Sequence, residues 1–406
     1  MKSFCILFVM LGLVLKISGA ELQRVEVTVG QECGDFRGSD GRILQAAVNY
    51  VRDLGGGTVR IKEGTYLMRD SLTLSDNIRI IGEPGKTVLV SCDAHQSALA
   101  SSAGTNQYQV SVSDPSGFRI GDGIMVQDEN SMYGFSCSQA TIISRIDEKT
   151  FGISRPLSRD YEPKRKAKVT TAFPVVAARG SKNITIEGLV IDGNSENMEY
   201  LTGCRGGGIY LLECEDVMIR KCEVRNYDGD GISFQTTQRV VIEDCESHSH
   251  TGSGLHPGCG TENATVSKVS CHSNGGDGLF LCWNVKFSKF NNNDFSGNKR
   301  HGISIGMKNS DNQFLVNAIK KNTKAGIFFR KQPESNGAHR NVFKTNTIMD
   351  NGVPVEIQGA HNDLEFRKNA IGSSKGSNGE KKAFVVDPES KGLALEENEF
   401  VNVEER

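Results

Sequence analysis

An alternation of apolar and polar positions recurs through the middle of the chain at a fixed spacing. Each copy begins with a glycine and an aliphatic residue, and another apolar residue usually follows two positions later, as in a strand with one buried face. The aliphatic positions are Ile209, Ile232, Leu255, Leu279, Ile303 and Ile327. The glycines before them, at positions 208, 231, 254, 278, 302 and 326, are 23 or 24 residues apart. This period is typical of a solenoid of stacked coils.

A second apolar segment in each coil is followed by a recurring turn position. It is occupied by Cys222, Cys245, Asn293, Asn317 and Asn346. In a stacked coil, each asparagine amide is expected to bond its counterpart one coil away, about 4.8 Å along the axis. No helix-period stripe separates the copies, which excludes helical solenoids. The sequence therefore predicts an all-β fold, a right-handed parallel β-helix.

The segments on the N-terminal side of the repeat predict a capping helix and an inserted module. Residues 40–54 show a helical apolar stripe with Asp40 placed to cap its start, so we expect an amphipathic helix that plugs the open end of the solenoid. Residues 21–100 are then the N-terminal cap and first coils. Residues 101–173 interrupt the coils with short antiparallel-type strands and turns, which predicts a small inserted β module. Residues 174–406 form the main β-helix.

The first 20 residues resemble a secretory signal peptide. Lys2 precedes an apolar run that ends near Ile17, and the small residues Ser18-Gly19-Ala20 follow. The run is too short for a membrane span, so we expect a secreted or extracytoplasmic protein. The formal net charge is −2, and the one concentration of basic residues is at 164–168. This pattern argues against a nucleic-acid partner.

Cysteines are frequent for a chain that is expected to be exported. The sequence has 11 of them, and Cys5 lies in the leader. Cys222 and Cys245 stand in the turn column, where a small buried side chain replaces asparagine, so we predict free thiols there. The roles of Cys259 and Cys282, near strand ends, are left open.

Four motifs near the N-terminus resemble the opening of the pectate-lyase-like superfamily. They are Leu44-Gln45-Ala46-Ala47, Gly55-Gly56-Gly57-Thr58-Val59, Glu63-Gly64-Thr65-Tyr66 and Ile80-Ile81-Gly82. The superfamily includes polysaccharide lyases, polygalacturonase-type hydrolases, alginate epimerases and phage tailspikes. The resemblance implies the β-helix fold and a polysaccharide substrate, and it does not select one reaction.

Polar residues that could carry chemistry fall on one stripe of the predicted solenoid. Residues after the aliphatic position, or just before the glycine, should point outward on consecutive coils. The stripe contains Asp228, Asp230, Gln235, His256, Asp277, His301 and Arg330, with Phe280 and Trp283 beside them. We predict that it is a solvent-accessible groove in which exposed aromatic rings stack on sugars. Asp before glycine is also a common turn residue, and the aromatics could simply pack under a loop.

Asp230 and Asp277 are candidates for the paired carboxylates of a glycosidase. Two coils separate them, about 9.6 Å of backbone, which side-chain tilt can reduce to the range of an inverting enzyme. Asp277 is expected to be the general acid and Asp230 the base, with His301 holding the protonation state of Asp277. The interpretation requires both carboxylates to reach the substrate.

Part of this stripe is similar to motifs of polygalacturonase-type hydrolases. His301-Gly302-Ile303-Ser304-Ile305-Gly306 matches their His-Gly-x-Ser-Ile-Gly element, and Arg330-Lys331 resembles the Arg-x-Lys pair that binds a sugar carboxylate. The Asn-Thr-Asp element is replaced by Leu255-His256-Pro257-Gly258, and the acid next to Asp277 is missing. His256-Pro257 resembles, in reverse order, part of the Asp-Pro-His motif of alginate epimerases.

The sequence thus predicts a secreted carbohydrate-active enzyme that cleaves an acidic polysaccharide as a hydrolase or lyase. One alternative is a uronate C5-epimerase or lyase with His256 as base and Arg330 on the uronate carboxylate. The other is a non-catalytic glycan-binding or adhesion solenoid. No metal site or cofactor is predicted from the residues, and the resemblance implies Ca²⁺ only for a lyase.

Overall fold

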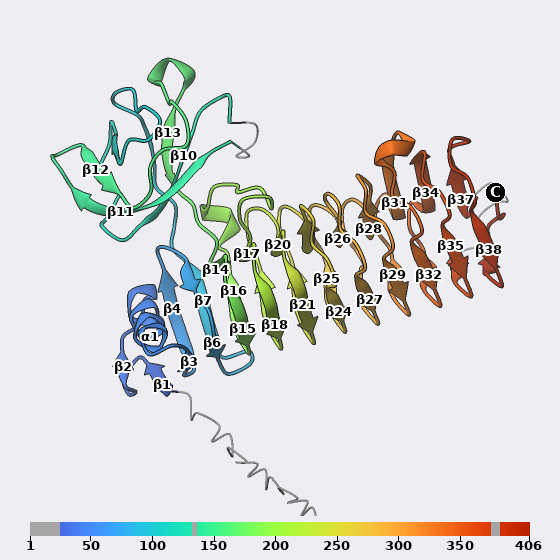
Figure 1. The fold of residues 1–406 in the computed structure, drawn as a ribbon, viewed down its shortest axis with the longest axis horizontal. Coiled ribbons are helices and arrows are strands. Elements are labelled where there is room, and N and C mark those ends of the chain that lie inside the picture. The colour runs from blue at the N-terminus through green and yellow to red at the C-terminus, as the bar shows by residue number, and fades with distance from the viewer. Residues whose placement is uncertain (1–24, 132–135, 375–381) are drawn as a thin grey trace, which may run out of the picture.

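The computed structural model describes residues 25–131, 136–374 and 382–406, and these form a parallel β-helix with an inserted module (Figure 1). The predicted signal peptide lies outside the described residues. Short strands from successive coils stack into three long parallel sheets, which we call sheets A, B and C. Sheet A runs along the lower edge of the solenoid in Figure 1, and sheet C runs along the upper edge.

Sheet A is the longest and carries the chain from the cap to the last coil. Its strands, in chain order, are β1 (Val25–Gly30), β2 (Phe36–Arg37), β3 (Gly57–Ile61), β6 (Ile78–Ile81), β15 (Lys182–Glu187), β18 (Glu215–Arg220), β21 (Gln238–Glu243), β24 (Thr265–Ser267), β27 (Lys289–Asn291), β29 (Gln313–Leu315), β32 (Val342–Lys344), β35 (Glu365–Arg367) and β38 (Ala394–Glu396).

Sheet B consists of two stacks that isolated bridges at Asp294 connect. The first stack contains β4 (Gly64–Met68), β7 (Thr87–Ser91), β16 (Val190–Asp192), β19 (Glu223–Arg225), β22 (Glu246–His248) and β25 (Ser270–His272). The second contains β30 (Ala318–Lys320), β33 (Thr347–Met349), β36 (Ala370–Gly372) and β39 (Glu399–Val401).

Sheet C carries the strands that follow the repeat glycines. They are β5 (Leu72–Leu74), β14 (Val176–Arg179), β17 (Ile209–Leu212), β20 (Ile232–Gln235), β23 (Leu255–Gly258), β26 (Leu279–Phe280), β28 (Ile303–Ile305), β31 (Ala325–Gln332), β34 (Val353–Gly359) and β37 (Phe384–Val386). The six predicted aliphatic residues pair in register from Ile209 to Ile327, and all six are fully buried. The predicted interior column is confirmed.

Asparagine side chains connect the coils inside the turn between sheets A and B. Each amide donates to the side-chain oxygen of the next asparagine at 2.9–3.0 Å, and that oxygen also accepts the backbone N–H of the previous one. The ladder consists of Asn293, Asn317, Asn346, Asn369 and Asn398. Cys222, Cys245 and Val269 hold the same column in earlier coils. Next to the ladder, the rings of Phe290, Phe314, Phe343 and Phe366 stack at 4.5–5.0 Å.

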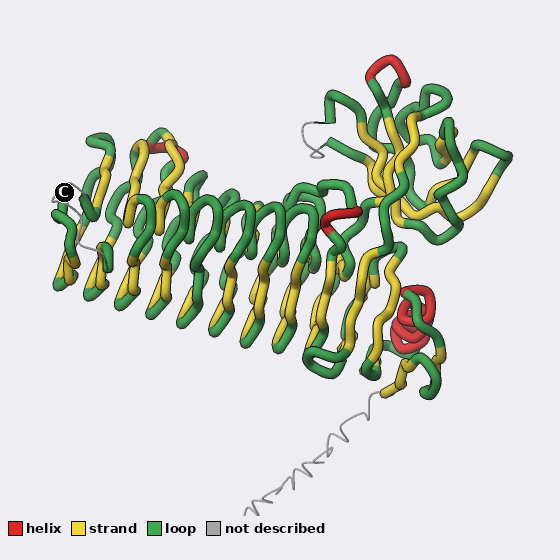
Figure 2. The backbone as a smooth tube through the Cα atoms, turned by 180° about the vertical axis from the view of Figure 1, so that it is seen from behind, coloured by secondary structure: helices red, strands yellow, loops and turns green. Residues whose placement is uncertain are grey.

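Helix α1 (Gly41–Asp53) closes the N-terminal end of the coil stack (Figure 2). The Asp40 side chain accepts a hydrogen bond from the backbone N–H of Arg42 at 3.0 Å, which confirms the predicted cap. Leu44, Ala47, Val48 and Val51 are buried against the first coils. The apolar face of the helix therefore shields the end of the core from water, as we expected. Among the described residues, no helix has the length and apolar character needed to cross a membrane.

The inserted module is an antiparallel sheet with its own apolar core, and it projects from the N-terminal coils on the side of sheet C. Its strands are β8 (Gln96–Ala98), β9 (Gln109–Ser111), β10 (Gly123–Gln127), β11 (Ser138–Arg145), β12 (Thr150–Ile153) and β13 (Lys168–Thr171). Because β8 pairs with β13, the module's sheet begins before residue 101. Three short 3-10 helices complete the elements: η1 (Pro163–Arg165), η2 (Ser195–Asn197) and η3 (Glu334–Asn336).

Replacement of Asn317 by alanine should destabilise the solenoid. The substitution removes the acceptor of the Asn293 amide and the donor to Asn346 and to the Phe290 carbonyl. Each buried group left without a partner costs about 1–3 kcal/mol, so urea denaturation should show a loss of at least about 3 kcal/mol. Asn291→Ala, at an exposed position on β27, is the control and should change stability by less than about 0.5 kcal/mol. Equal effects of the two substitutions would contradict a ladder role.

Cys222 and Cys245 should behave as buried thiols. Both are free and buried, and their Sγ atoms donate to backbone carbonyls of Arg220 at 3.3 Å and Glu243 at 3.2 Å. A thiol reagent should therefore modify them slowly in the native protein and completely after denaturation. Peptide mapping that recovers a disulfide between the two would overturn this prediction.

Candidate functional site

The outward face of sheet C collects the residues that the sequence placed on one stripe. Ser233 pairs with His256, and Phe280, Ser304 and Phe328 follow in register on later coils. Asp230, Asp277 and His301 lie at the bends where the chain enters sheet C. The predicted columns are therefore present. Whether these side chains can reach a ligand depends on the residues that surround them.

A loop at residues 199–206, which we call the covering loop, lies over the middle of this face. Its carbonyl oxygen at Gly203 accepts from Ser233 Oγ at 2.5 Å and from Gln235 Nε2 at 3.4 Å, and Tyr210 donates to the Cys204 carbonyl at 3.0 Å. A Cβ on Gly203 would lie 1.8 Å from Asp230 Oδ2, so only glycine allows this approach.

The covering loop contradicts the prediction of an open groove at Asp230, Gln235 and His256. These residues are only 7%, 1% and 4% exposed. Gln235 also donates to Ser233 Oγ at 2.9 Å and to the His256 carbonyl at 3.1 Å, so its amide group ties the strand to the loop and does not face a ligand. The sequence could not reveal this cover, because the loop folds back across coils that follow it in the chain.

Asp230 and His256 form a buried ion pair under the loop. His256 Nδ1 lies 2.5 Å from Asp230 Oδ2, and the other carboxylate oxygen accepts the backbone N–H of Ser253. Burial opposes charge on both groups, but their mutual attraction outweighs it. The pKa of Asp230 is lowered, and the pKa of His256 is raised to about 9. This pairing fixes the orientation of the imidazole ring.

Asp277 is fully buried, which also contradicts its predicted place in a groove. Its Oδ1 accepts the backbone N–H of His301 at 2.9 Å, and its Oδ2 has no hydrogen-bond partner among the described residues. Burial raises its pKa, and Arg300 opposes the shift. Ser253 occupies the coil between Asp230 and Asp277 and accepts from the Asp277 N–H at 3.3 Å. The coil between the two carboxylates is therefore already occupied by a side chain.

His301 does not reach the Asp277 carboxylate with its ring. Nδ1 accepts the backbone N–H of Ala325 at 3.0 Å, and the ring stacks on Phe328 at 4.3 Å. Burial and the nearby Arg300 and Lys324 lower its pKa to about 4. The ring is then neutral at pH 7 with its proton on Nε2, and it contributes a hydrogen-bond donor. We predicted that the His301 side chain would hold the protonation state of Asp277, but the contact between the two residues is made by the backbone N–H of His301.

Arg330 is committed to the protein backbone. Its guanidinium donates to the carbonyls of Leu281 at 2.5 Å and Cys282 at 2.9 Å, and to Ser304 Oγ at 2.9 Å, and it lies 4.4 Å over the Phe280 ring. Burial lowers its pKa to about 10. The predicted carboxylate contact would have to replace these bonds.

The other predicted binding residues differ in access to solvent. Lys331 is exposed, and the Trp283 side chain is 47% exposed. Asp228 is half-buried and accepts from Thr251 Oγ1 at 2.7 Å. Lys331 and Trp283 therefore remain available to a ligand, while Phe280 packs between His256 and Arg330.

Two cysteines lie near the free side of the His256 ring. Cys204 Sγ is 4.0 Å from His256 Nε2, and one donor atom each from Cys204, His256 and Cys282 lies within 4.8 Å of the others. Cys259 is a further free thiol on the coil of His256. The sequence left Cys259 and Cys282 open and gave no signal for Cys204, which lies in an irregular loop.

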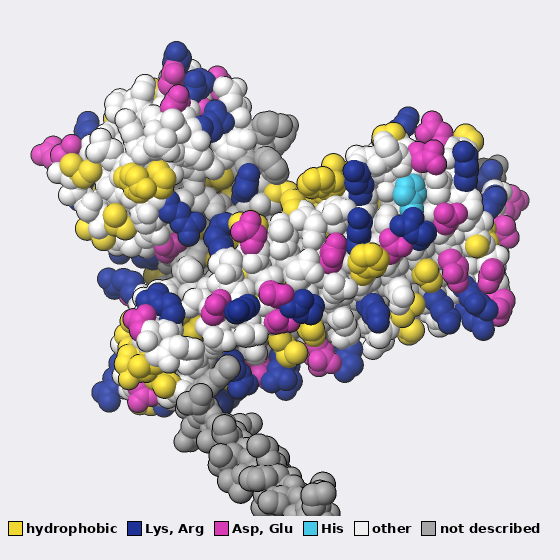
Figure 3. All heavy atoms as spheres, viewed as in Figure 1, with side chains coloured by type: hydrophobic (Ala, Val, Ile, Leu, Met, Phe, Trp, Pro, Cys, Tyr) yellow, Lys and Arg dark blue, Asp and Glu magenta, His cyan; other side chains and the backbone are white. Residues whose placement is uncertain are grey.

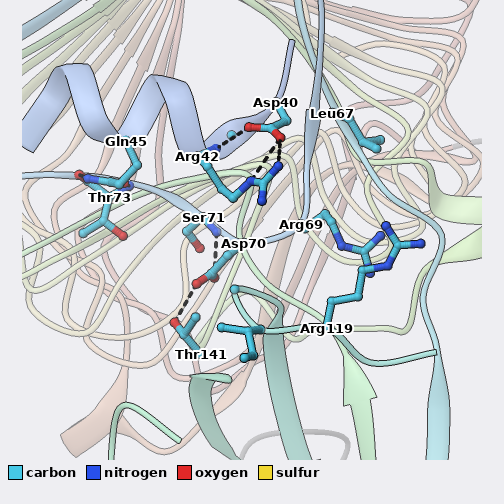
Figure 4. A pocket seen from close by; sticks show the side chains of 13 residues that line it. Asp40, Arg42, Gln45, Leu67, Arg69, Asp70, Ser71, Thr73, Arg119 and Thr141 are labelled. Carbon is cyan, nitrogen blue, oxygen red and sulfur yellow. Dashed lines mark hydrogen bonds and ion pairs between the residues drawn. The ribbon is translucent and has the colours of Figure 1, made fainter. Parts of the chain in front are cut away.

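Two clefts, which we call together the arginine cleft, lie where the module meets the capping helix and first coils. The first, of about 490 Å³, is bordered by Arg42, Arg69 and Arg119 (Figure 4). The second, of about 350 Å³, is bordered by Arg155 and Arg179 and extends along sheet C at β14. Arg42 and Arg69 are paired with acids.

Arg119 and Arg155 bring two further positive charges to the arginine cleft. Both are exposed, and neither has an ion-pair partner within 4 Å among the described residues. Arg179 donates to Gln139 Oε1 at 3.1 Å and lies over the Tyr210 ring. The sequence could not bring these arginines together, because they come from the module and from a strand on the solenoid.

Asp70 is the carboxyl group that both parts of the arginine cleft share. It accepts from Thr141 Oγ1 of the module at 2.6 Å and from the Ser71 N–H at 2.7 Å (Figure 4). Burial raises its pKa to about 6, although the hydrogen bonds and Arg155 act in the opposite direction. A carboxyl group with this pKa can hold a proton under mildly acidic conditions.

A further hollow, of about 420 Å³, lies on sheet C beyond the covering loop. It is bordered by Arg300, His301, Lys324, Phe328 and Glu356. Arg300 and Lys324 are exposed, so this hollow is also cationic. Figure 3 shows the surface dipping between the module and the C-terminal coils.

Solved structures share this fold over nearly the whole chain. The mannuronan C-5 epimerase AlgE4 A-module of Azotobacter vinelandii is 16% identical, with a TM-score of 0.55, 92% of this chain covered and 97% of that chain. A glycoside hydrolase structure is 10% identical, with a TM-score of 0.55 and coverage of 92% and 96%. At these identities the likeness shows the fold. No curated protein sequence matches the chain.

A family model described as "Right handed beta helix region" matches residues 168–281 and 207–371. Together the matches span residues 168–371, or 204 of 406 residues. The handedness and the parallel coils predicted from the glycine spacing are thereby confirmed. The chain belongs to the right-handed β-helix family.

Proposed function

We propose that this protein binds an acidic polysaccharide along sheet C and acts on it as a hydrolase, lyase or epimerase. The observation that carries the proposal is the arginine cleft, in which Arg119 and Arg155 have no ion-pair partner among the described residues. Guanidinium groups bind carboxylates in a two-pronged geometry, so repeated uronates suit a row of arginines.

The polymer would leave the arginine cleft at Arg179 and continue toward Arg300 and Lys324. Five strand-to-strand steps separate β14 from β28, about 24 Å at the spacing of a parallel sheet. Trp283 is exposed along this route and offers an apolar face to a sugar ring. The leader-like N-terminus supports a location outside the cytoplasm, where such polymers occur.

Asp70 is the proposed general acid in the arginine cleft. Its carboxyl group is oriented by Thr141 and Ser71, and Arg155, on the border of the same cleft, is available to bind a substrate carboxylate. The carboxylates that the sequence favoured, Asp230 and Asp277, are covered in this conformation. Asp230 would act on substrate only after displacement of the covering loop, and Asp277 only after movement of the residues packed around it.

A second candidate function is binding without catalysis. It is favoured by one observation: Asp230, His256 and Asp277 are buried and bonded to the protein itself. In that case Asp70 serves only to hold the module against the first coils. Product analysis with uronate polymers separates the two functions.

Arg155→Ala should weaken the binding of polygalacturonate or alginate. Loss of one charge-assisted contact costs about 1.5 kcal/mol, which is roughly a tenfold increase in Kd by calorimetry. Arg37→Ala, at an exposed arginine outside the cleft, is the matched control and should leave Kd unchanged. Added salt should weaken binding, and a neutral glucan should not bind. Unchanged affinity of Arg155→Ala, or equal binding of the neutral glucan, would refute the arginine cleft as the binding site.

Asp70→Asn should lower turnover by about 10²-fold or more while binding persists, because the variant cannot donate a proton. In the unmodified protein, the folded-state pKa of about 6 keeps Asp70 protonated below that pH, so activity should fall as pH rises through 6. Reducing-end release without ultraviolet absorbance indicates hydrolysis, an unsaturated product indicates a lyase, and changed uronate stereochemistry indicates an epimerase. Full activity of Asp70→Asn would reduce Asp70 to a structural residue, and bound polymer without product would favour the binding function.

A further inference from the structure

We propose that Cys204, His256 and Cys282 bind a zinc ion beneath the covering loop, with a water molecule as the fourth ligand. One donor atom from each of these three residues lies within 4.8 Å of the others. Two thiolates, one imidazole and a water are a known ligand set for zinc. This inference does not depend on the proposed polysaccharide activity.

The His256 ring is already oriented as a metal ligand. Its Nδ1 is 2.5 Å from Asp230 Oδ2, and its Nε2 faces Cys204 Sγ at 4.0 Å. With a proton shared between Nδ1 and the carboxylate, Nε2 is the nitrogen that can offer a lone pair to a cation. A carboxylate behind a ligating histidine is a recurrent arrangement in zinc sites, where it sets the tautomer and strengthens the ligand.

The spacing of the donors suits a small tetrahedral ion. Zinc lies about 2.3 Å from sulfur and about 2.0–2.1 Å from nitrogen, which places neighbouring ligand atoms roughly 3.5–3.8 Å apart. The observed separation of 4.0 Å for Cys204 and His256, and the limit of 4.8 Å for the set, are slightly larger. Side-chain movements of less than about 1 Å would bring the donors to zinc distance.

Buried polar side chains hold the backbone of the two cysteines on either side of the histidine. Tyr210 donates to the Cys204 carbonyl at 3.0 Å, and Ser233 donates to that of Gly203 at 2.5 Å. On the other side, Arg330 donates to the Cys282 carbonyl at 2.9 Å. The ligands thus come from three separate segments, each held in place without the metal.

Two other chemistries could use the same atoms. Cys282 could form a disulfide with Cys204, since both are free thiols and their sulfur atoms lie within 4.8 Å of each other. Cys204 could also be a nucleophile with His256 and Asp230 behind it. The nearby Cys282 favours zinc over a nucleophile, because a reactive thiolate beside a second thiol is prone to oxidation to a disulfide.

The test is the metal content of the full chain, purified without chelator and dialysed, by mass spectrometry. We expect about one zinc per chain, and cobalt in its place should give a thiolate-to-cobalt charge-transfer band. The cluster thiols should react with a thiol reagent only after chelation. Cys204→Ser should lose the metal, and Cys214→Ser, at a buried cysteine outside the cluster, should keep it.

Asp230→Asn tests the site without removing a ligand. The amide keeps the acceptor for Ser253 but reverses the hydrogen bond to His256, so zinc affinity should fall about 10–100-fold. If Cys204→Ser does not fold, this variant and cobalt titration of the unmodified protein test whether the site binds a metal. Zinc retention by a folded Cys204→Ser, or absence of metal together with a Cys204–Cys282 or Cys259–Cys282 disulfide in the peptide map, would overturn the proposal. Absence of metal with reduced thiols that do not bind cobalt would also overturn it.

Discussion

Hydrogen bonding along the solenoid axis is the constraint on which the structure depends. Each coil has turns whose backbone groups are buried, and these groups have no partner inside their own coil. The asparagine ladder supplies partners from the next coil, through two bonds per side-chain oxygen and two per amide. The apolar columns can then stack in register, as Phe290, Phe314, Phe343 and Phe366 do. Burial of the aliphatic residues supplies the driving force, and the ladder determines where each coil lies.

The repeat made the fold predictable, and the site depends on features that have no repeat. Ile209 and its counterparts fixed the register of sheet C because their spacing is directly visible in the chain. The same spacing placed Asp230, His256 and Asp277 correctly relative to one another. It could not show that Gly203 and Cys204 lie against Asp230 and His256, since an irregular loop has no period. The arginine cleft was missed for a similar reason, because Arg155 and Arg179 meet only through the packing of the module.

The covered and the open parts of sheet C carry different kinds of polar side chain. Under the covering loop, the charged groups are paired within the protein: Asp230 with His256 and Ser253, and Arg330 with backbone carbonyls. Beyond the loop, Arg119, Arg155, Arg300 and Lys324 are exposed on either side. Buried paired groups favour a fixed geometry, whereas exposed cations favour exchange with a mobile polyanion. The two regions therefore suit a structural centre and a substrate surface.

The coils of the ladder also differ in length. Asn293 and Asn317 are 24 residues apart, but Asn317 and Asn346 are 29 residues apart, and both pairs make the same hydrogen bonds. Part of the longer coil forms η3 between β31 and β32, at the raised rim beside sheet C (Figure 1). Because this corner lies outside the asparagine ladder, insertions there can accumulate without disturbing the core. Relatives of this chain can therefore diverge in rim height, and in the polymers that they admit, while the stack beneath them stays the same.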